Sequence, residues 1–300
     1  MKEWPIPLAP LAEQQRIVEA IEEQLSRVDA GVAALESGRT RAASLLKAVL
    51  LAAVPDNAPP HWTRVTVGEA GEVRLGRQRS PRFHHGPNMR PYLRVANVFE
   101  DRINTSDVMT MHFSDEEFAR YRLEPGDILL NEGQSPHLLG RPAMYRGDPP
   151  NVAYTNSLLR FRANEGVLPE WALLVFRRHL HVKRFMRESN ITTNIAHLSA
   201  GRFKSIEFPV PSVAEQRRIL ASVDEALSIL AVTSATLDQQ RVRATTLRRA
   251  ILAAAFSGEL TAKSPEDEPA SVLLEQIARD RVAFNGHRPS IEASPTKASA

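Results

Sequence analysis

The 300-residue sequence contains no cysteine. This absence excludes disulfide bonds and a cysteine-ligated zinc site, and it is typical of a protein from a reducing compartment. No apolar run approaches the roughly 18 residues of a membrane-spanning helix. The opening Met1-Lys2-Glu3-Trp4-Pro5 also lacks the features of a signal peptide. We therefore expect a soluble, cytoplasmic protein that does not enter a membrane.

Motifs for catalysis and cofactor binding are also missing. The sequence has no Gly-x-x-x-x-Gly-Lys phosphate loop, no nucleophile elbow, and no histidines at a metal-binding spacing from carboxylates. Asp148-Pro149-Pro150-Asn151 is similar to the tetrad of amino-methyltransferases, but Asn151 replaces the aromatic residue that stacks on the base. Asp127 and Glu132 faintly resemble a nuclease pattern in which Gln134 replaces the usual lysine. We expect no metal, no cofactor and no catalysis by this chain alone.

The most informative feature that is present is an internal repeat. Residues 6–54 match residues 208–256 without a gap at a constant offset of 202, and 19 of the 49 positions are identical. The clearest block is Ala12-Glu13-Gln14-Gln15-Arg16-Ile17 against Ala214-Glu215-Gln216-Arg217-Arg218-Ile219. About 150 unrelated residues separate the copies, so they cannot stack as a solenoid. The pattern indicates two similar scaffold elements that present a different module between them.

Each copy of the repeat predicts one long helix. Apolar residues recur at spacings of three, four and seven, which places one apolar stripe on each helix. Proline-rich leads at 5–10 and 209–211 delay the helix starts, and Gly258 ends the second helix. Gly31 and Gly38 weaken the first helix at a bend or a close approach. Helices of about 43 residues, or roughly 65 Å, need a partner, so we expect the two to pair.

The predicted fold class is α+β, with one mixed α/β domain inserted between two long helices that pair as an antiparallel coiled coil. Loops rich in glycine, proline and asparagine lie at 76–90, 131–142 and 146–156, where recognition residues usually reside. Strands are expected at 62–67, 92–98, 127–130 and 157–161, and helices after Ser114 and from Pro169 to Met186. The expected domains are 1–54 (lead and first helix), 55–207 (insert), 208–257 (second helix) and 258–300 (tail with a short helix at 271–283 and a disordered end).

Positive charge is concentrated in one stretch of the insert. Within 71–97, six arginines are accompanied by one acidic residue, Glu72, as a phosphate-contacting patch requires. A solvated loop whose arginines pair with carboxylates elsewhere is the alternative. Polar residues on the other loops are of the types that reach bases and phosphates. We predict DNA contacts from Arg77, Gln78, Arg79, Arg82, His84, His85, Arg94, Asn97, Asn131, Gln134, Ser135, Arg141, Thr192, Thr193, Asn194, His197 and Lys204.

Several blocks together resemble the specificity subunit of type I restriction–modification systems. The proline-rich lead followed by Ala-Glu-Gln-x-x-Ile, present twice, is similar to the conserved spacer of that family. The tail, with Gly258-Glu259-Leu260 and Glu268-Pro269-Ala270, resembles the usual end of such subunits. The insert resembles one class of their target recognition domains at residues 92–98, 123–133, 140–143, 156–162 and 195–203. The likeness covers residues 5–283.

The resemblance implies a non-catalytic, sequence-specific DNA-binding subunit. Its target recognition domain, residues 55–207, would read one half of a split DNA site. Its helices would dock methyltransferase subunits and, in restriction complexes, the restriction subunits. We assign partner contacts to Glu13, Gln14, Arg16, Glu215, Gln216 and Arg218.

Members of the family usually carry two recognition domains, whereas this chain carries one and corresponds to the C-terminal half. A natural half-subunit is expected to form a homodimer, and a truncated gene or a fragment are the alternatives. A different function is also open, namely a coiled-coil interaction module whose insert binds protein. An autonomous nuclease or methyltransferase would show turnover, which we do not expect. The residues alone do not reveal the target bases.

Overall fold

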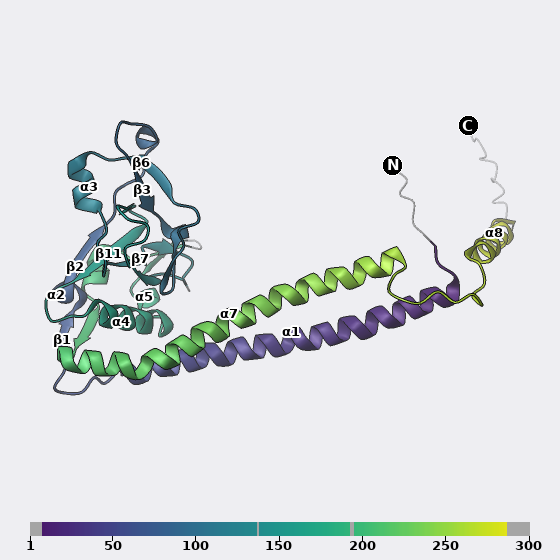
Figure 1. Cartoon of the computed structure of the whole chain (residues 1–300), viewed down its shortest axis with the longest axis horizontal. Coiled ribbons are helices and arrows are strands. Elements are labelled where there is room, and N and C mark those ends of the chain that lie inside the picture. The colour runs from purple at the N-terminus through teal and green to yellow at the C-terminus, as the bar shows by residue number, and fades with distance from the viewer. Residues whose placement is uncertain (1–7, 137, 193–194, 287–300) are drawn as a thin grey trace, which may run out of the picture. The chain divides into compact units, whose positions relative to one another are not determined.

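The computed structural model describes residues 8–136, 138–192 and 195–286 (Figure 1). Two helices dominate the chain, α1 (Leu11–Ala53) and α7 (Val213–Ser257), and a mixed α/β domain is inserted between them. The predicted fold class is therefore confirmed. The chain divides into two compact units, of which the larger is Arg41–Thr233 and the other combines residues up to Thr40 with those from Ser234. Each long helix belongs partly to one unit and partly to the other.

In the smaller unit, ion pairs fix the direction and register of the two helices. From one ion pair to the next, the partner on α7 moves back along the sequence by as many positions as the partner on α1 moves forward. The helices are therefore antiparallel in a single register. The pairs are exposed, so each stabilises the helices by only about 0.2–1 kcal/mol. They are Asp29–Arg248, Glu36–Arg241 (3.3 Å) and Arg39–Asp238 (3.4 Å).

The internal repeat makes this helix pair self-complementary. Glu36 is equivalent to Asp238 and Arg39 is equivalent to Arg241 at the offset of 202, so the repeat converts one ion pair into the other. A local pseudo-twofold axis therefore passes between the helices beside these residues. Gly38 lies there, and a Cβ atom on it would sit 3.3 Å from a methyl group of Leu237. This confirms the predicted close approach for Gly38 but not for Gly31, where a Cβ atom would meet no heavy atom within 4 Å.

The C-terminal end of α7 is closed by backbone hydrogen bonds. Gly258 adopts φ +73°, its N–H donates to the carbonyl of Ala255 (3.3 Å), and the Glu259 N–H donates to Ala254 (2.9 Å). This is the Schellman arrangement, which needs the left-handed conformation that glycine adopts freely. Gly258 ends the helix as predicted. A further helix follows, α8 (Ala270–Gly286).

The larger unit is built on a four-stranded antiparallel sheet of order β2-β11-β7-β9, against which α4 (Pro169–His181) packs. These strands are β2 (Gly71–Leu75), β11 (Leu158–Ala163), β7 (Ile128–Asn131) and β9 (Pro142–Met144). Helix α4 stops earlier than predicted because Lys183 takes a left-handed conformation, φ 58°. The chain then resumes as α5 (Arg184–Arg187).

Smaller sheets and short helices complete this unit. Strands β1 (Thr63–Thr66) and β14 (Glu207–Val210) pair antiparallel and bring the entry and exit of the domain together. The remaining strands are β3 (Met89–Leu93), β4 (Val98–Phe99), β5 (Arg102–Ile103), β6 (Met109–His112), β8 (Gly133–Gln134), β10 (Ala153–Tyr154), β12 (Asn190–Thr192) and β13 (Ile195–His197), in sheets β10-β3-β6, β12-β13-β8 and β4-β5. The remaining short helices are α2 (Val67–Ala70), α3 (Asp115–Tyr121) and α6 (Ala200–Lys204), together with 3-10 helices at Pro81–Phe83 and Val95–Asn97.

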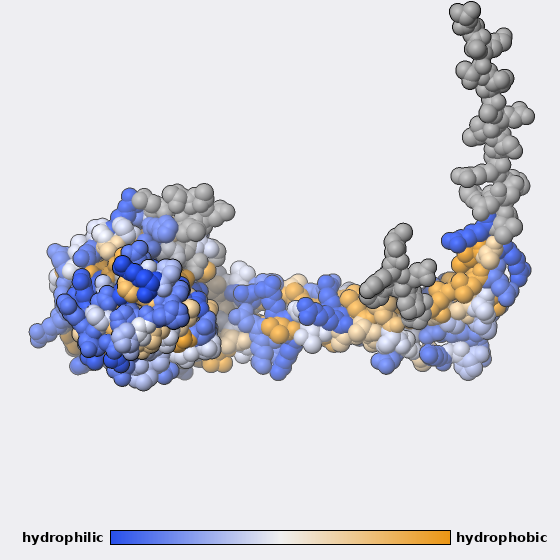
Figure 2. Space-filling view, turned by 90° about the horizontal axis from the view of Figure 1, so that it is seen from above, coloured by the Kyte–Doolittle hydropathy of each residue, from blue (hydrophilic) through white to orange (hydrophobic). Residues whose placement is uncertain are grey.

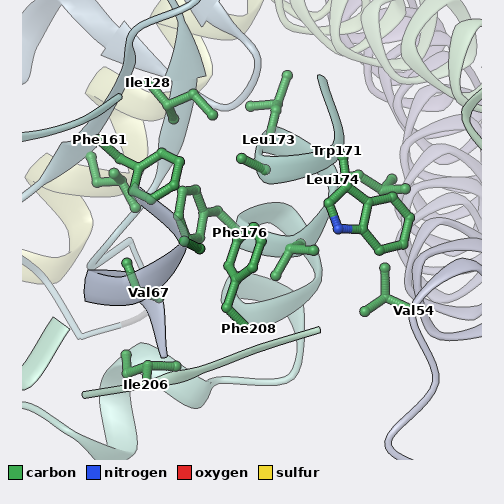
Figure 3. Packing of buried hydrophobic residues seen from close by; sticks show 14 of the residues in the cluster. Val54, Val67, Ile128, Phe161, Trp171, Leu173, Leu174, Phe176, Ile206 and Phe208 are labelled. Carbon is green, nitrogen blue, oxygen red and sulfur yellow. The ribbon is translucent and has the colours of Figure 1, made fainter. Parts of the chain in front are cut away.

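The core of the larger unit joins the domain to the ends of both long helices (Figure 3). Phe176 lies at its centre, with ring centroids 5.0 Å from Phe161 and 5.7 Å from Phe208. The Trp171 indole N–H donates to the carbonyl of Pro209 (2.9 Å), which satisfies the polar atom of a fully buried ring. Residues from α1, such as the fully buried Leu50, and from α7, such as Ile219, belong to the same cluster. The domain therefore folds as one body with these helix ends.

Candidate nucleic-acid interface

Arg77 is a structural residue of the arginine-rich segment. Its side chain is 5% exposed. The guanidinium donates to both carboxylate oxygens of Glu117 (2.9 and 2.8 Å) and to the carbonyl of His112, and it lies 3.7 Å from the Phe83 ring centroid. Every nitrogen is thus occupied within the domain. Arg77 shapes the loop that follows it and is not part of the surface we assign to DNA.

Asn97 is also committed to the fold. Its side-chain nitrogen donates to the carbonyls of Asn104 (3.0 Å) and Asp107 (2.9 Å), and its oxygen accepts the Arg94 N–H (3.0 Å). The residue is 2% exposed. A buried asparagine whose amide protons and oxygen are all bonded to the backbone is not accessible to a base, so we leave it out of the surface as well.

Three of the predicted arginines meet at one open concavity of about 450 Å³. Arg79 comes from the segment after β2, Arg94 from the end of β3, and Arg141 from the turn before β9. Ser157 lies beside them, and Phe99 of β4 forms part of the wall. Sequence reasoning missed Phe99, which lies outside the predicted loops, and Ser157, which directly follows the predicted loop 146–156. We call this site the arginine concavity; it is lined by Arg79, Arg94, Val95, Ala96, Phe99, Arg141 and Ser157.

The concavity carries more positive than negative charge. Arg94 forms an ion pair with Asp107. Arg141 instead donates to the Val98 carbonyl, and among the described residues neither it nor Arg79 has a carboxylate within ion-pair distance. Burial lowers the pKa of Arg141; the charge of Glu100 opposes this shift, and the charge of Arg102 adds to it. An anion bound here would compensate a guanidinium that the protein itself does not neutralise.

The other predicted DNA contacts have different surroundings. Gln78, Arg82, His84, His85 and Lys204 are exposed. His197 is half-exposed and its Nδ1 lies 3.4 Å from Glu132, and β13, which carries it, pairs with β8, which carries Gln134. Thr192 ends β12, and Ser135 follows β8. Thr193 and Asn194 lie outside the described residues.

Asn131 stands apart from the rest of the predicted set. It is fully buried at the end of β7, and neither its side-chain oxygen nor its nitrogen has a hydrogen-bond partner among the described residues. A buried amide without partners destabilises a fold by about 1–3 kcal/mol for each group. Its burial excludes direct contact with DNA in this conformation.

The predicted partner contacts at the start of α7 serve the domain itself. Gln216 is fully buried and its side chain bonds to the backbone of residues 166, 168 and 211. Glu215 accepts from His61 (3.1 Å) and lies 3.4 Å from the exposed Arg218. Of these three, Gln216 is unavailable to another protein.

The equivalent residues of α1 are less committed. Gln14 bonds to the Ala9 carbonyl (2.7 Å), and Arg16 forms an ion pair with Asp267 (2.5 Å). Glu13 is 5% exposed. A hollow of about 660 Å³ adjoins Gln14. It is lined by the start of α1, including Ile17 and Val18, and by the end of α7, including Phe256.

Comparison with known proteins agrees with this architecture. No family model matches the chain. The sequence is 26% identical over 310 aligned residues to the type I restriction enzyme EcoKI specificity subunit of Escherichia coli K12, covering 96% of this chain and 66% of that protein. Over almost its whole length the chain is thus similar to a type I specificity subunit. A second such relative is the StySPI specificity subunit of Salmonella potsdam, 25% identical over 305 residues, with 95% of this chain and 65% of that protein covered.

Solved structures of type I systems share the fold. A chain from a structure that addresses complex assembly and conformational transition of the type I system matches with a TM-score of 0.60 and 20% identity, over 85% of this chain and 61% of that one. The HsdS subunit of Thermoanaerobacter tengcongensis matches with a TM-score of 0.51 and 22% identity, over 85% and 60%. The chain thus spans less than two thirds of the length of each of these four proteins.

Proposed function

We propose that this chain is a sequence-specific DNA-binding subunit of a type I restriction–modification complex, that it reads one half of a split site, and that it carries out no chemistry itself. The observation that carries the proposal is the arginine concavity, where three segments bring three guanidinium groups together, two of them without a carboxylate partner among the described residues, on a fold shared with a solved HsdS subunit. Salt-dependent DNA binding requires such a surface. The residues proposed to contact DNA are Gln78, Arg79, Arg82, His84, His85, Arg94, Gln134, Ser135, Arg141, Thr192, Thr193, Asn194, His197 and Lys204.

We further propose that the paired helices dock methyltransferase subunits and, through them, restriction subunits in the cytoplasm. Large apolar side chains remain exposed on α1 and α7, and hydrophobic surface gathers along these helices in Figure 2. Contiguous exposed apolar surface marks sites of association. By length and composition alone, one 18-residue window of α7 would also be apolar enough to cross a membrane. The exposed side chains are Val18, Leu45, Ile229, Val232, Val242, Leu247 and Phe256.

We propose that the chain acts as a half-subunit that forms a homodimer, so that two identical recognition domains address an inverted split site. The helix seam formed by Glu36, Arg39, Asp238 and Arg241 beside Gly38 supports this, because a helix pair that matches itself suits association of identical copies. Sedimentation with the methyltransferase bound tests it. Two copies of the chain per complex are expected, and one copy per complex would contradict the homodimer.

Selection of duplexes from a randomised pool tests the DNA-binding function. We expect the wild-type chain, with its methyltransferase, to enrich one sequence and to lose affinity steeply as salt rises. The double variant Arg79→Gln/Arg82→Gln should lose at least about tenfold in affinity, because both side chains are exposed and neither is needed for packing. Arg77 is left unchanged because its loss would disturb the loop.

A matched control separates charge from position. Arg64→Gln removes an equally exposed arginine from β1, whose guanidinium bonds to the Ala58 carbonyl within the domain, and it should leave affinity within about twofold. Binding that ignores salt and sequence would instead favour the alternative function, a coiled-coil interaction module or a remnant of a two-domain subunit.

A further inference from the structure

Arg141 is held in place before any ligand arrives. Its Nη2 donates to the Val98 carbonyl and its guanidinium carbon lies 4.7 Å from the centroid of the Phe99 ring. Its side chain is partly buried. A guanidinium fixed by a carbonyl and a ring loses little conformational entropy when it binds an anion.

A second guanidinium of the concavity can complete an anion site. Arg79 is exposed, and among the described residues its guanidinium meets only the ring of Tyr92, at 5.6 Å. The Ser157 hydroxyl lies 3.0 Å from that of Thr155, which donates its own proton to the Leu93 carbonyl (3.3 Å), so Ser157 donates to Thr155 and is not a donor to an anion. Asp107 takes up one nitrogen of Arg94, but this carboxylate is 71% exposed and therefore screened by solvent.

The same surroundings do not suit a base. A base would stack on an aromatic face, but the Phe99 ring is already contacted by the guanidinium groups of Arg102 and Arg141, each 4.7 Å from its centroid. No asparagine or glutamine lines the concavity, so the side chains that read adenine are missing there, and the Nη2 of Arg141, which a bidentate contact to guanine would use, already donates to the Val98 carbonyl. The chemistry of the site is that of guanidinium donors, which bind phosphate oxygens.

We propose that the arginine concavity binds one phosphate group of the DNA backbone, with Arg141 as a fixed donor and Arg79 as a mobile one, and that it positions the duplex without reading its sequence. This rests on the proposed DNA-binding function. A free phosphate or nucleotide offers the same chemistry, so the test has to separate these sources.

Arg141→Gln is the central variant, measured in the complex with the methyltransferase on the duplex that the wild type selects. We expect affinity to fall about tenfold, as for loss of one charged hydrogen bond. The fall should be equal on selected and unselected duplexes. The slope of log affinity against log salt should shrink by about 0.9, as for one lost phosphate contact. Arg141→Lys should retain most of the slope, and the Arg64→Gln control should change neither quantity.

Each other outcome has a defined meaning. A changed selected sequence with Arg141→Gln would make Arg141 a base reader, and unchanged affinity and slope would remove it from the interface; both overturn the proposal. Arg79→Gln repeats the measurement at an exposed residue if Arg141→Gln lowers the melting temperature. Stabilisation of the wild type by millimolar inorganic phosphate, lost in Arg141→Gln without a change in duplex affinity, would assign the site to a free anion and also overturn it. A wild type that binds no duplex would refute the proposed function itself.

Discussion

The two long helices begin with the same motif in different surroundings. At the start of α7, the Gln216 side chain is fully buried and makes three hydrogen bonds. Its Nε2 donates to the carbonyls of Gly166 (2.8 Å) and Pro211 (2.9 Å), and its Oε1 accepts the N–H of Leu168 (2.9 Å). The glutamine thereby joins the helix to the loop that leads into α4.

At the start of α1, only the local part of this pattern recurs. The Gln14 Nε2 donates to the carbonyl of Ala9, which is equivalent to Pro211 at the repeat offset. Among the described residues, no segment like 166–168 bonds to Gln14, and the hollow beside it remains open. The same motif therefore binds a second segment of the chain, residues 166–168, at the start of α7, and binds no such segment at the start of α1.

Removing the two glutamines should break this comparison most clearly. Gln216→Ala leaves one buried N–H and two carbonyls without a partner, and we expect a loss of about 3 kcal/mol in the free energy of unfolding. Gln14→Ala should cost less than about 1 kcal/mol, because its side chain is half-buried and makes one bond. Urea unfolding of both variants measures the two losses. Equal losses in the free energy of unfolding would show that the two glutamines contribute equally to stability.

Reversing charge at the helix seam should have an intermediate effect confined to the smaller unit. Arg39→Glu with Arg241→Glu places four carboxylates beside the pseudo-twofold axis, and we expect a loss of about 1–2 kcal/mol there. Hydrogen exchange should rise for residues 234–257 of α7 and stay unchanged for 213–230, which pack on the domain core.

The matched control for the seam restores attraction with opposite polarity. Adding Glu36→Arg and Asp238→Arg to the charge-reversed variant should recover most of the wild-type exchange protection. Continued loss of protection in the fourfold variant would mean that packing, not charge, sets the register.

Acidification should give the smallest difference. The hydrogen bond from Arg16 holds the pKa of Asp267 below its usual value, against the opposing effect of burial. A carboxyl with a lowered folded pKa stabilises the fold above its unfolded pKa, about 3.9, and this contribution is lost as pH falls through the folded value. Residues 258–267 should therefore be protected from protease at pH 5–7 and become exposed progressively as the pH falls below the unfolded pKa, and Arg16→Ala should abolish this dependence.

The scaffold could be predicted from the sequence because its signals are local. Apolar periodicity predicted α1 and α7. The N-cap of α3 could be predicted from Ser114 and Glu117: the Ser114 Oγ accepts the Glu117 N–H (3.1 Å), and the Glu117 carboxylate accepts the Ser114 N–H (3.0 Å). The register of the seam also follows from the repeat once one ion pair is known.

The candidate site was less predictable because it depends on distant contacts. Six arginines look alike between residues 71 and 97, but Glu117, forty positions away, neutralises Arg77 and leaves Arg79 free of carboxylates among the described residues. Arg141 gains its fixed position from a carbonyl and a ring on β4. Gln216 could not be told from Gln14 by sequence, since what differs is the segment that covers it.

The constant register of the seam limits how the helix pair can change in length. Consider a helical turn inserted into α1 alone, between Asp29 and Arg39. If Arg39 stays opposite Asp238, Asp29 no longer lies opposite Arg248, and if Asp29 stays in place, Arg39 moves away from Asp238. One of the two ion pairs is lost in either case. An equivalent turn in α7 restores both. Insertions are therefore tolerated in matched steps, each of four residues in both helices, and every step moves the two ends of the helix pair apart by about 6 Å.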